Sequence, residues 1–236
     1  MTSAPVAFVA GATGFVGGAV VAELVRRDVL TLAHVRPDSR DVDGWRRKFA
    51  ALGPHCRTDT TAWDEKALTA TLRDRAVTHV FCLIGTTKAR AKQDQVAGDI
   101  YEAIDVGLTR LLAAAASACG MRPRLLYLSS VGASARSSSG YLRARAKAEA
   151  LVQGAGVPWV IARPSMIVGP GRDDARPMER FAGAVGDGLL ATIGLFGAKK
   201  TRAAYRSTTP SVLGPALVRL ALDGPADLIA AGDDLR

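Results

Sequence analysis

The stretch that decides the fold is Val6–Gly17, with the sequence VAFVAGATGFVG. Its apolar first half, Val6–Ala10, runs directly into a turn with glycines at 11, 14 and 17, and a helical pattern begins at Ala19. Glycines let the backbone approach a pyrophosphate closely, and the start of a helix offers it unpaired N–H groups and a positive dipole end. Because a strand precedes this turn and a helix follows it, the pattern predicts a dinucleotide-binding turn rather than an ordinary tight turn.

Strand and helix patterns alternate along the rest of the chain. Short runs rich in Val, Ile and Leu are typical of parallel strands that are covered on both faces. We expect strands at Ala7–Gly11, Leu30–Arg36, Cys56–Asp59, Val77–Ile84, Arg124–Ser130 and Trp159–Ser165. We expect helices at Phe15–Arg27, Glu65–Arg73, Ala97–Ala118, Tyr141–Gln153 and Ser211–Leu222. With right-handed crossovers, this order predicts an α/β fold with a doubly wound parallel sheet and a ligand crevice at the carboxyl ends of the strands.

The size of the chain bounds its domain organisation. With 236 residues, of which 48 % are hydrophobic, it forms a full core without disulfides or metals. We expect one dinucleotide-binding domain over residues 1–236, to which residues 166–236 contribute a smaller lobe on the substrate side. Within that lobe, a glycine-spaced apolar segment, Phe181–Phe196, is expected to cover the substrate pocket, with a docking site for a protein partner as the alternative.

Composition narrows the classes of protein. The net charge of +9 is spread along the chain and aromatic residues make up only 6 %, so nothing indicates a basic stripe for nucleic acid. The excess positive charge favours anionic cofactors and substrates instead. The sequence shows neither a secretory signal nor an apolar run long enough to span a bilayer. The cysteines at 56, 82 and 119 have no metal or disulfide spacing, so we expect a cytoplasmic protein of undetermined oligomeric state.

Two positions bear on the choice of nicotinamide cofactor. Arg36 ends the second expected strand, where a cofactor without a 2′-phosphate would favour an acidic residue. A guanidinium at this point favours NADP(H), although a solvated loop arginine is the alternative and Asp38 leaves NAD open. Asp59, at the end of the third strand, is a candidate for the adenine amino group or for an ordinary turn.

A second group of residues follows the fourth and fifth strands. Leu83, Ile84, Gly85 and Thr86 lie where the backbone would pass the middle of the cofactor. Leu128, Ser129 and Ser130 end the fifth strand, and a hydroxyl there would hold a reacting carbonyl oxygen. Tyr141 and Arg145 share one face of the next helix because they are four residues apart. A phenol beside a fixed cation has its ionised form favoured, which suits acid–base work, although simple packing of Tyr141 on the sheet is the alternative.

Five motifs together resemble the short-chain dehydrogenases/reductases of the extended or atypical kind. They are GATGFVG at 11–17, CLIGTT at 82–87, LSSVGA at 128–133, YLRAR at 141–145 and RPSMIVG at 163–169. Within that superfamily, the chain resembles most closely the Tat-interacting-protein-like, NmrA-like or epimerase-like NAD(P)-binding proteins. The motifs are specific for the superfamily by their order and spacing, and less specific for the subgroup.

The resemblance implies hydride transfer between a nicotinamide and a carbonyl or alcohol. Ser130, with Ser129 as a near alternative, would polarise the carbonyl, and Tyr141 would donate the proton. Backbone of the segment Arg163–Met166 would lie against the nicotinamide carboxamide, with Pro164, Ser165 and Met166 as the expected contacts. The full set of expected cofactor contacts is Gly11, Ala12, Thr13, Gly14, Phe15, Val16, Arg36, Asp59, Leu83, Ile84, Gly85, Thr86, Leu128, Ser129, Tyr141, Arg145, Pro164, Ser165 and Met166.

Two positions depart from the family's pattern. Arg145 stands where the family has a lysine, and an arginine keeps the charge but does not release a proton at useful pH. Asp105 stands where an asparagine commonly supports that lysine, so an Asp105–Arg145 pair is one arrangement and separate orientations are the other. The sequence therefore favours an NADP(H)-dependent oxidoreductase acting on a small molecule. The alternative is a cofactor-binding redox sensor or scaffold with little turnover, which acts through a protein partner.

Overall fold

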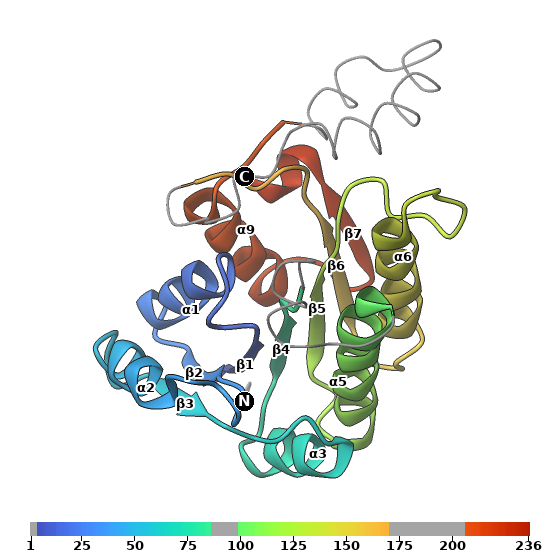
Figure 1. The fold of residues 1–236 in the computed structure, drawn as a ribbon. Coiled ribbons are helices and arrows are strands. Elements are labelled where there is room, and N and C mark those ends of the chain that lie inside the picture. The colour runs from blue at the N-terminus through green and yellow to red at the C-terminus, as the bar shows by residue number, and fades with distance from the viewer. Residues whose placement is uncertain (1–3, 86–98, 170–205) are drawn as a thin grey trace.

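The computed structural model describes residues 4–85, 99–169 and 206–236, and a seven-stranded sheet forms the centre of this part (Figure 1). The strands are β1 (Val6–Ala10), β2 (Leu30–His34), β3 (Cys56–Asp59), β4 (His79–Cys82), β5 (Arg124–Leu128), β6 (Trp159–Arg163) and β7 (Leu228–Ala231). They lie in the order β3-β2-β1-β4-β5-β6-β7, and every neighbouring pair is parallel. The predicted doubly wound parallel sheet is confirmed, because the chain proceeds outward from β1 in both directions.

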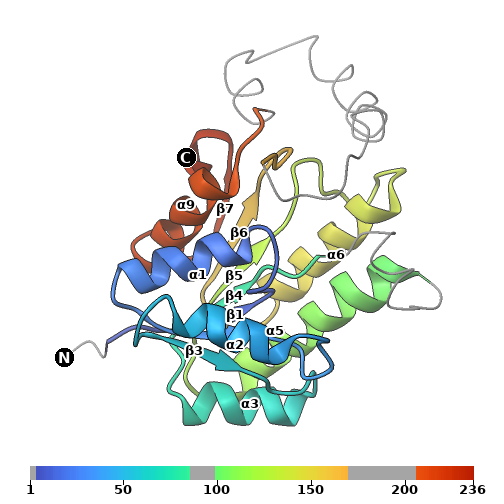
Figure 2. The ribbon, with the colours of Figure 1, turned by 60° about the vertical axis from the view of Figure 1, so that its left-hand side comes forward.

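Helices cover both faces of this sheet (Figure 2). One face carries α1 (Gly17–Arg26), α2 (Val42–Ala50) and α9 (Pro210–Leu222). The other face carries α3 (Glu65–Asp74), α5 (Gly107–Ala118) and α6 (Gly140–Gln153). A π-helical turn, η1 (Tyr101–Val106), leads directly into α5, and a 3-10 turn, η2 (Gly232–Leu235), follows β7.

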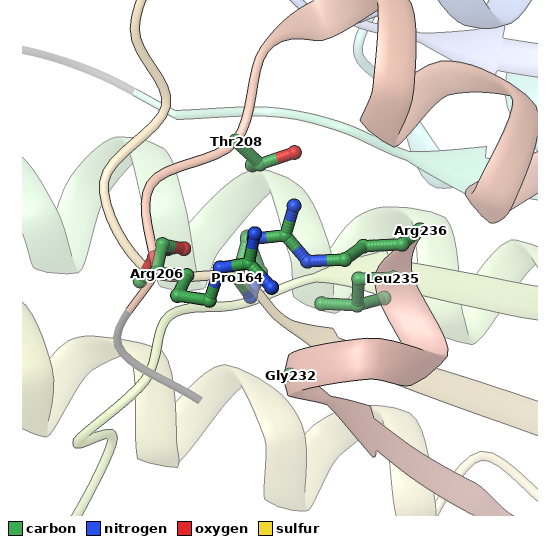
Figure 3. A pocket seen from close by; sticks show the side chains of 7 residues that line it. Pro164, Arg206, Thr208, Gly232, Leu235 and Arg236 are labelled. Atoms are coloured by element: carbon green, nitrogen blue, oxygen red, sulfur yellow. Dashed lines mark hydrogen bonds between the residues drawn. The ribbon is translucent and has the colours of Figure 1, made fainter. Parts of the chain in front are cut away.

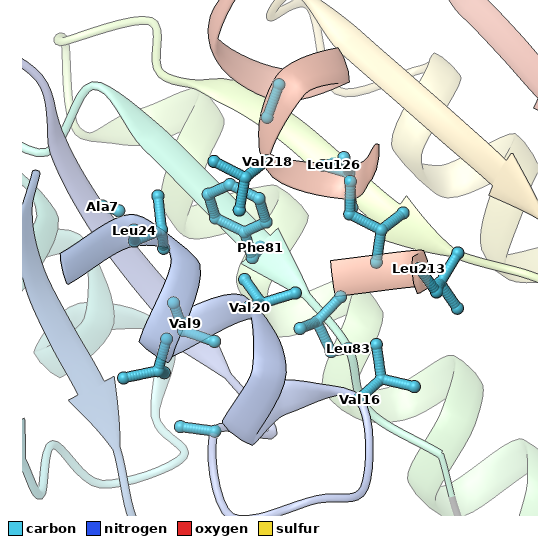
Figure 4. Close-up of a cluster of buried hydrophobic side chains, with 14 of the residues drawn as sticks. Ala7, Val9, Val16, Val20, Leu24, Phe81, Leu83, Leu126, Leu213 and Val218 are labelled. Carbon is cyan, nitrogen blue, oxygen red and sulfur yellow. The ribbon is translucent and has the colours of Figure 1, made fainter. Parts of the chain in front are cut away.

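Each face of the sheet has its own buried cluster. Between the sheet and α1 with α9, side chains such as Val20, Phe81 and Leu213 interdigitate (Figure 4). The opposite cluster places Leu112 of α5 near Tyr127 of β5. Strands buried on both faces have almost continuous apolar sequences, which is why the sequence alone revealed them.

The strands end earlier than predicted at the edge where the ligand crevice was expected. The predicted strand Leu30–Arg36 ends at His34, and Val77–Ile84 spans only His79–Cys82. The ladder stops because the central strand turns away: the amide of Leu83 donates to the Ala10 carbonyl at 3.0 Å, and the next residue of β1, Gly11, has a φ of 86°. The loops that begin here therefore form the rim of the crevice.

Two elements were missed by the sequence analysis. Helix α2 begins after Asp41, whose side chain accepts a hydrogen bond from the Gly44 amide at 2.9 Å. Strand β7 is only four residues long and adds to the free edge of β6. The predicted helix Ala97–Ala118 is confirmed from η1 onward, and its first two residues lie outside the described ones.

The expected smaller lobe stays a prediction. Most of it, residues 170–205 with the segment Phe181–Phe196, lies outside the described residues. Of its described part, α9 packs against α1 and β7 extends the sheet, so both belong to the layers of the main domain.

Candidate active site

The carboxyl ends of β1 and β4 lie side by side, with Ala10 opposite Cys82. The chain leaves β1 toward α1 on one face of the sheet, whereas α5, which follows β4, covers the other face. Open α/β sheets bind their ligands where successive crossovers diverge in this way. The candidate crevice therefore lies over the ends of β1 and β4.

The three glycines of the turn after β1 serve different purposes. A Cβ on Gly11 would lie 2.7 Å from the Leu83 carbonyl oxygen, and a Cβ on Gly17 would lie 2.0 Å from the Gly11 oxygen. Protein packing alone thus requires both of these glycines. A Cβ on the exposed Gly14 would meet only the Gly11 oxygen, at 3.1 Å. The open space beside Gly14 fits a bound pyrophosphate next to the start of α1.

The other turn residues divide between the core and the crevice. Ala12 and Val16 are buried in the cluster beneath α1, so a contribution to cofactor binding would come from their backbone. Thr13 and Phe15 are half-buried. The Phe15 ring approaches the loop after β6, where a Cβ on Gly169 would lie 3.1 Å from its Cζ. The turn is therefore packed against the core beneath α1 and against the loop after β6.

The residues after β4 lie beside this turn. Leu83 and Ile84 are buried, while Gly85 is exposed. A Cβ on Gly85 would lie 2.7 Å from Nη2 of Arg145, so glycine leaves room here for the guanidinium. Thr86, the last expected contact in this stretch, lies outside the described residues.

Arg36 and Asp59 are neighbours at the ends of β2 and β3. The amide of Val35 donates to the Asp59 carbonyl at 2.9 Å, which places Arg36 directly beside this strand end. The Arg36 side chain is 39 % exposed, and its Nε lies 3.7 Å from Oδ1 of Asp38. Asp59 Oδ1 accepts from the Thr61 amide at 2.9 Å, so this carboxylate stabilises a turn, the second of its two expected roles.

Arg145 is buried and joins the ends of two strands. Its Nη1 donates to the Ile84 carbonyl after β4 at 3.1 Å, to the Leu128 carbonyl of β5 at 3.0 Å and to the Tyr127 hydroxyl at 2.9 Å. Its Nη2 forms an ion pair of 2.9 Å with Oδ1 of Asp105, whose side chain is 0 % exposed. The Asp105–Arg145 pair, one of two arrangements left open by the sequence, is thus the one observed.

The surroundings of Arg145 keep it charged and keep Tyr127 neutral. Burial by itself lowers the pKa of Arg145, but the neighbouring Tyr141, Tyr127 and Asp105 outweigh burial, and the net pKa is raised. Burial also raises the pKa of Tyr127, against the opposing effect of Arg145. Tyr127 is therefore a hydrogen-bonding phenol rather than a proton donor near neutral pH.

Tyr141 stands at the start of α6, half-buried above this cation. The guanidinium carbon of Arg145 lies 5.1 Å from the centre of the Tyr141 ring, so the two side chains share one face of the helix, as predicted. The ring of Tyr101, from η1, meets it edge-on with ring centres 5.6 Å apart. Tyr141 is thus oriented from below by a cation and from the side by a second aromatic ring.

The two serines after β5 have different partners. Ser129 Oγ donates to Oε1 of Glu149 at 2.5 Å, and Glu149 accepts two further hydrogen bonds from Arg163, from Nε at 2.8 Å and from Nη2 at 2.5 Å. Ser130 Oγ donates to the adjacent Val131 carbonyl at 3.2 Å. The Ser129 hydroxyl therefore ties β5 to α6, which leaves Ser130 as the stronger candidate of the pair for a carbonyl contact.

The segment after β6 closes the crevice on its far side. The Pro164 carbonyl accepts from the Val131 amide at 2.9 Å, and the Met166 carbonyl accepts from the Thr208 amide at 2.9 Å. Ser165 Oγ donates to the Arg206 carbonyl. A shallow pocket, open to solvent, lies behind this segment (Figure 3). Its lining residues are Pro164, Ser165, Arg206, Thr208, Gly232, Leu235 and Arg236.

Sequence reasoning missed two contributors to the site. Tyr127 was treated only as part of a strand, although its hydroxyl bonds Arg145. Glu149 was covered only by the predicted helix Tyr141–Gln153, yet it continues the spacing of four residues from Tyr141 through Arg145 and so lies on the same face of α6. That spacing was a usable signal for Glu149, whereas a buried tyrosine in an apolar strand carries none.

In ranges 4–85, 99–169 and 206–236 there is no cluster of His, Cys, Asp and Glu that would hold a metal ion. The helices in those ranges are too short or too polar to cross a membrane.

The fold and the glycine turn define a dinucleotide-binding α/β protein of the Rossmann type. The chain belongs to the NAD dependent epimerase/dehydratase family, whose model matches residues 7–203. The match confirms the expected family and supports a nicotinamide cofactor. Among curated protein sequences, none is significantly similar to this chain.

Many solved structures share the fold at low sequence identity. A putative epimerase from Burkholderia cenocepacia J2315 is 22 % identical with a TM-score of 0.65, over 96 % of this chain and 75 % of that one. An NADPH-dependent quinone oxidoreductase from Escherichia coli, complexed with NADPH, is 19 % identical with a TM-score of 0.62, over 97 % and 69 %. A UDP-Glc/GlcNAc 4-epimerase from Campylobacter jejuni is 12 % identical with a TM-score of 0.69, over 97 % and 78 %. At these identities the likeness establishes the fold alone.

Proposed function

We propose that the protein is an NADP(H)-dependent oxidoreductase that transfers hydride to or from the carbonyl or alcohol group of a small molecule. One observation carries this proposal: Tyr141 lies over the buried Arg145 guanidinium, 5.1 Å from ring centre to cation, at the rim of the crevice between β1 and β4. A phenol held beside a fixed cation is equipped for acid–base work, and the same edge of the sheet carries a glycine turn that fits a pyrophosphate.

The chain's own residues then have distinct tasks. When bound, the nicotinamide supplies the site that donates or accepts the hydride. Ser130 holds the carbonyl oxygen by a hydrogen bond, and Tyr141 donates a proton to that oxygen. The positive charge of Arg145 stabilises the negative charge that develops on the phenol oxygen as its proton leaves. Arg145 keeps its own proton throughout, because a guanidinium does not release it at useful pH.

The proton donor is tested by the rate of NADPH oxidation against a panel of aldehydes, ketones and quinones. Removal of the Tyr141 hydroxyl, in Tyr141→Phe, should lower turnover by at least a hundredfold, within the usual range for a lost general acid. Tyr101→Phe is the matched control, because it removes a hydroxyl from the neighbouring ring and should retain turnover. Equal rates in the Tyr141→Phe variant and the parent would refute the assigned role.

The cofactor preference rests on Arg36. A charge-assisted contact between this guanidinium and a 2′-phosphate contributes about 1.5–3 kcal/mol, equivalent to roughly a ten- to hundredfold preference for NADPH over NADH. Fluorescence titration of both cofactors measures it, and Arg36→Ala should abolish it. Arg46→Ala, which removes the same charge from the exposed surface of α2, should leave the preference intact. If the two cofactors bind the parent protein equally well, the proposed contact does not exist and Asp38 becomes the candidate for NAD.

A second candidate function is supported by the bonding of Arg145. Both terminal nitrogens of its guanidinium are engaged by protein groups, Nη1 by three acceptors and Nη2 by Asp105. A cation held in this way favours a cofactor-binding protein with little turnover, acting as a sensor through a partner. In that case NADPH binding raises the melting temperature of the protein by mass action, but the protein converts none of the substrates in the panel.

A further inference from the structure

We propose that the pocket behind the segment 164–166 binds an oxyanion, the phosphate or carboxylate group of a small organic ligand, at a site separate from the dinucleotide turn. The pocket lies between the end of β6, the stretch that enters α9, and η2 (Figure 3). Binding there does not depend on hydride transfer, so the proposal goes beyond the function proposed above.

Two arginines make the pocket positive. The side chains of Arg206 and Arg236 both line it, and Figure 3 shows their guanidinium groups turned toward one another. Among the ion pairs of the described ranges, none includes Arg206. Arg236 has a single long one, 3.8 Å from its Nε to Oδ1 of the exposed Asp233. Two like charges that face each other are unfavourable until an anion lies between them. Nη2 of Arg236 also donates to the Ser207 carbonyl at 3.3 Å, a neutral acceptor.

A buried hydroxyl provides the second observation. Thr208 lines the same pocket, is only 7 % exposed, and its Oγ1 has no hydrogen-bond partner. Its backbone is fixed, since its amide donates to Met166 and its carbonyl accepts from Val168. Buried polar side chains without a partner are rare in proteins. An unpaired hydroxyl on a residue that lines the pocket fits a site that is completed when a ligand supplies the missing partner.

The position of the pocket separates it from the cofactor's phosphates. The pyrophosphate is expected at the end of β1 and the 2′-phosphate at the end of β2, whereas the pocket borders β6. With strands about 4.8 Å apart, three steps across the sheet place it roughly 14 Å from the first and four steps roughly 19 Å from the second. The pocket nevertheless shares Pro164 and Ser165 with the segment expected beside the nicotinamide.

Inorganic phosphate is the probe, titrated by isothermal calorimetry with and without saturating NADPH. We expect saturable binding that is weakened about ten- to hundredfold in Arg206→Gln and in Arg236→Gln, the loss of one charge-assisted contact each. The matched control is Arg75→Gln, on an exposed residue at the C-terminal end of α3 that does not line the pocket. Arg206 is exposed, so its variant should fold, and unchanged melting temperatures verify this.

Competition distinguishes the kind of anion. If acetate displaces phosphate, the site accepts carboxylates as well, and if acetate does not, the site is specific for phosphate; either result supports the proposal.

Thr208→Val should weaken phosphate binding and leave the fold intact, because valine matches threonine in shape. The absence of saturable binding, or an equal loss in Arg75→Gln, would overturn the proposal. Tyr141→Phe should bind phosphate normally, so a failed proton donor and a failed anion site give different results.

Discussion

Removal of the buried carboxylate beside Arg145 is the perturbation with the largest expected effect on stability. In Asp105→Ala the guanidinium loses its ion pair of 2.9 Å while its side chain, 7 % exposed, stays inside the protein. Breaking a buried pair from one side costs about 3–5 kcal/mol, because an uncompensated charge remains. For a chain of this size each kcal/mol shifts the melting temperature by about 2–4 °C, so we expect a decrease of roughly 6–20 °C.

The same two elements provide the control. Lys147 of α6 and Glu102 of η1 form a second ion pair, 2.5 Å long, but their side chains are 53 % and 47 % exposed. Glu102→Ala should therefore cost no more than about 1 kcal/mol. Urea unfolding followed by circular dichroism measures the free energy of unfolding of both variants. Their midpoints are compared with the same m-value, the slope of that free energy against urea concentration.

A double variant separates charge from packing. If the cost of Asp105→Ala arises from the stranded guanidinium, then Asp105→Leu combined with Arg145→Met should be more stable than Asp105→Ala alone, since buried ion pairs replaced by apolar groups often lose little. A cost for Asp105→Ala below about 1 kcal/mol, or no larger than that of Glu102→Ala, would refute the reasoning.

Three further predictions concern other parts of the molecule. Gly14→Ala should weaken NADPH and NADH equally, by at least about tenfold, with little change in melting temperature, whereas Gly17→Ala should lower the melting temperature because its Cβ would lie 2.0 Å from a carbonyl oxygen. A loss of stability in Gly14→Ala as large as in Gly17→Ala would contradict this. Burial, helped by a nearby arginine, lowers the pKa of His79 to about 4. Below pH 6.5 the unfolded chain therefore binds the proton more readily, and stability falls by up to about 3 kcal/mol as the pH drops from 6.5 to 4; His79→Gln should flatten this dependence in acid titrations of the unfolding midpoint. Burial raises the pKa of Cys82 to about 11, so this thiol should resist Ellman's reagent in the native protein at pH 8 and react in urea; rapid reaction of native Cys82 would show that the strand end opens.

Much of the fold followed from local patterns. The strands are apolar because helices cover both faces of the sheet, so six of the seven observed strands could be found from composition and length. Strand β7 was missed because four apolar residues fit a helix as well as a strand until their pairing with β6 is known. Helix α2 was missed although Asp41, its capping residue, was visible in the sequence.

The sequence by itself determined those parts of the candidate site that depend on neighbouring residues. The glycine turn and the shared face of Tyr141 and Arg145 depend on spacings of three and four residues, which the geometry of a turn and a helix converts directly into positions. Only the tertiary structure decided which groups these side chains meet. Arg145 pairs with Asp105, Ser129 with Glu149, and Arg206 faces Arg236 across a pocket. Each of these pairs joins residues that are at least 20 positions apart in the sequence. They meet because the fold brings distant strands and helices together, and no local pattern encodes that meeting.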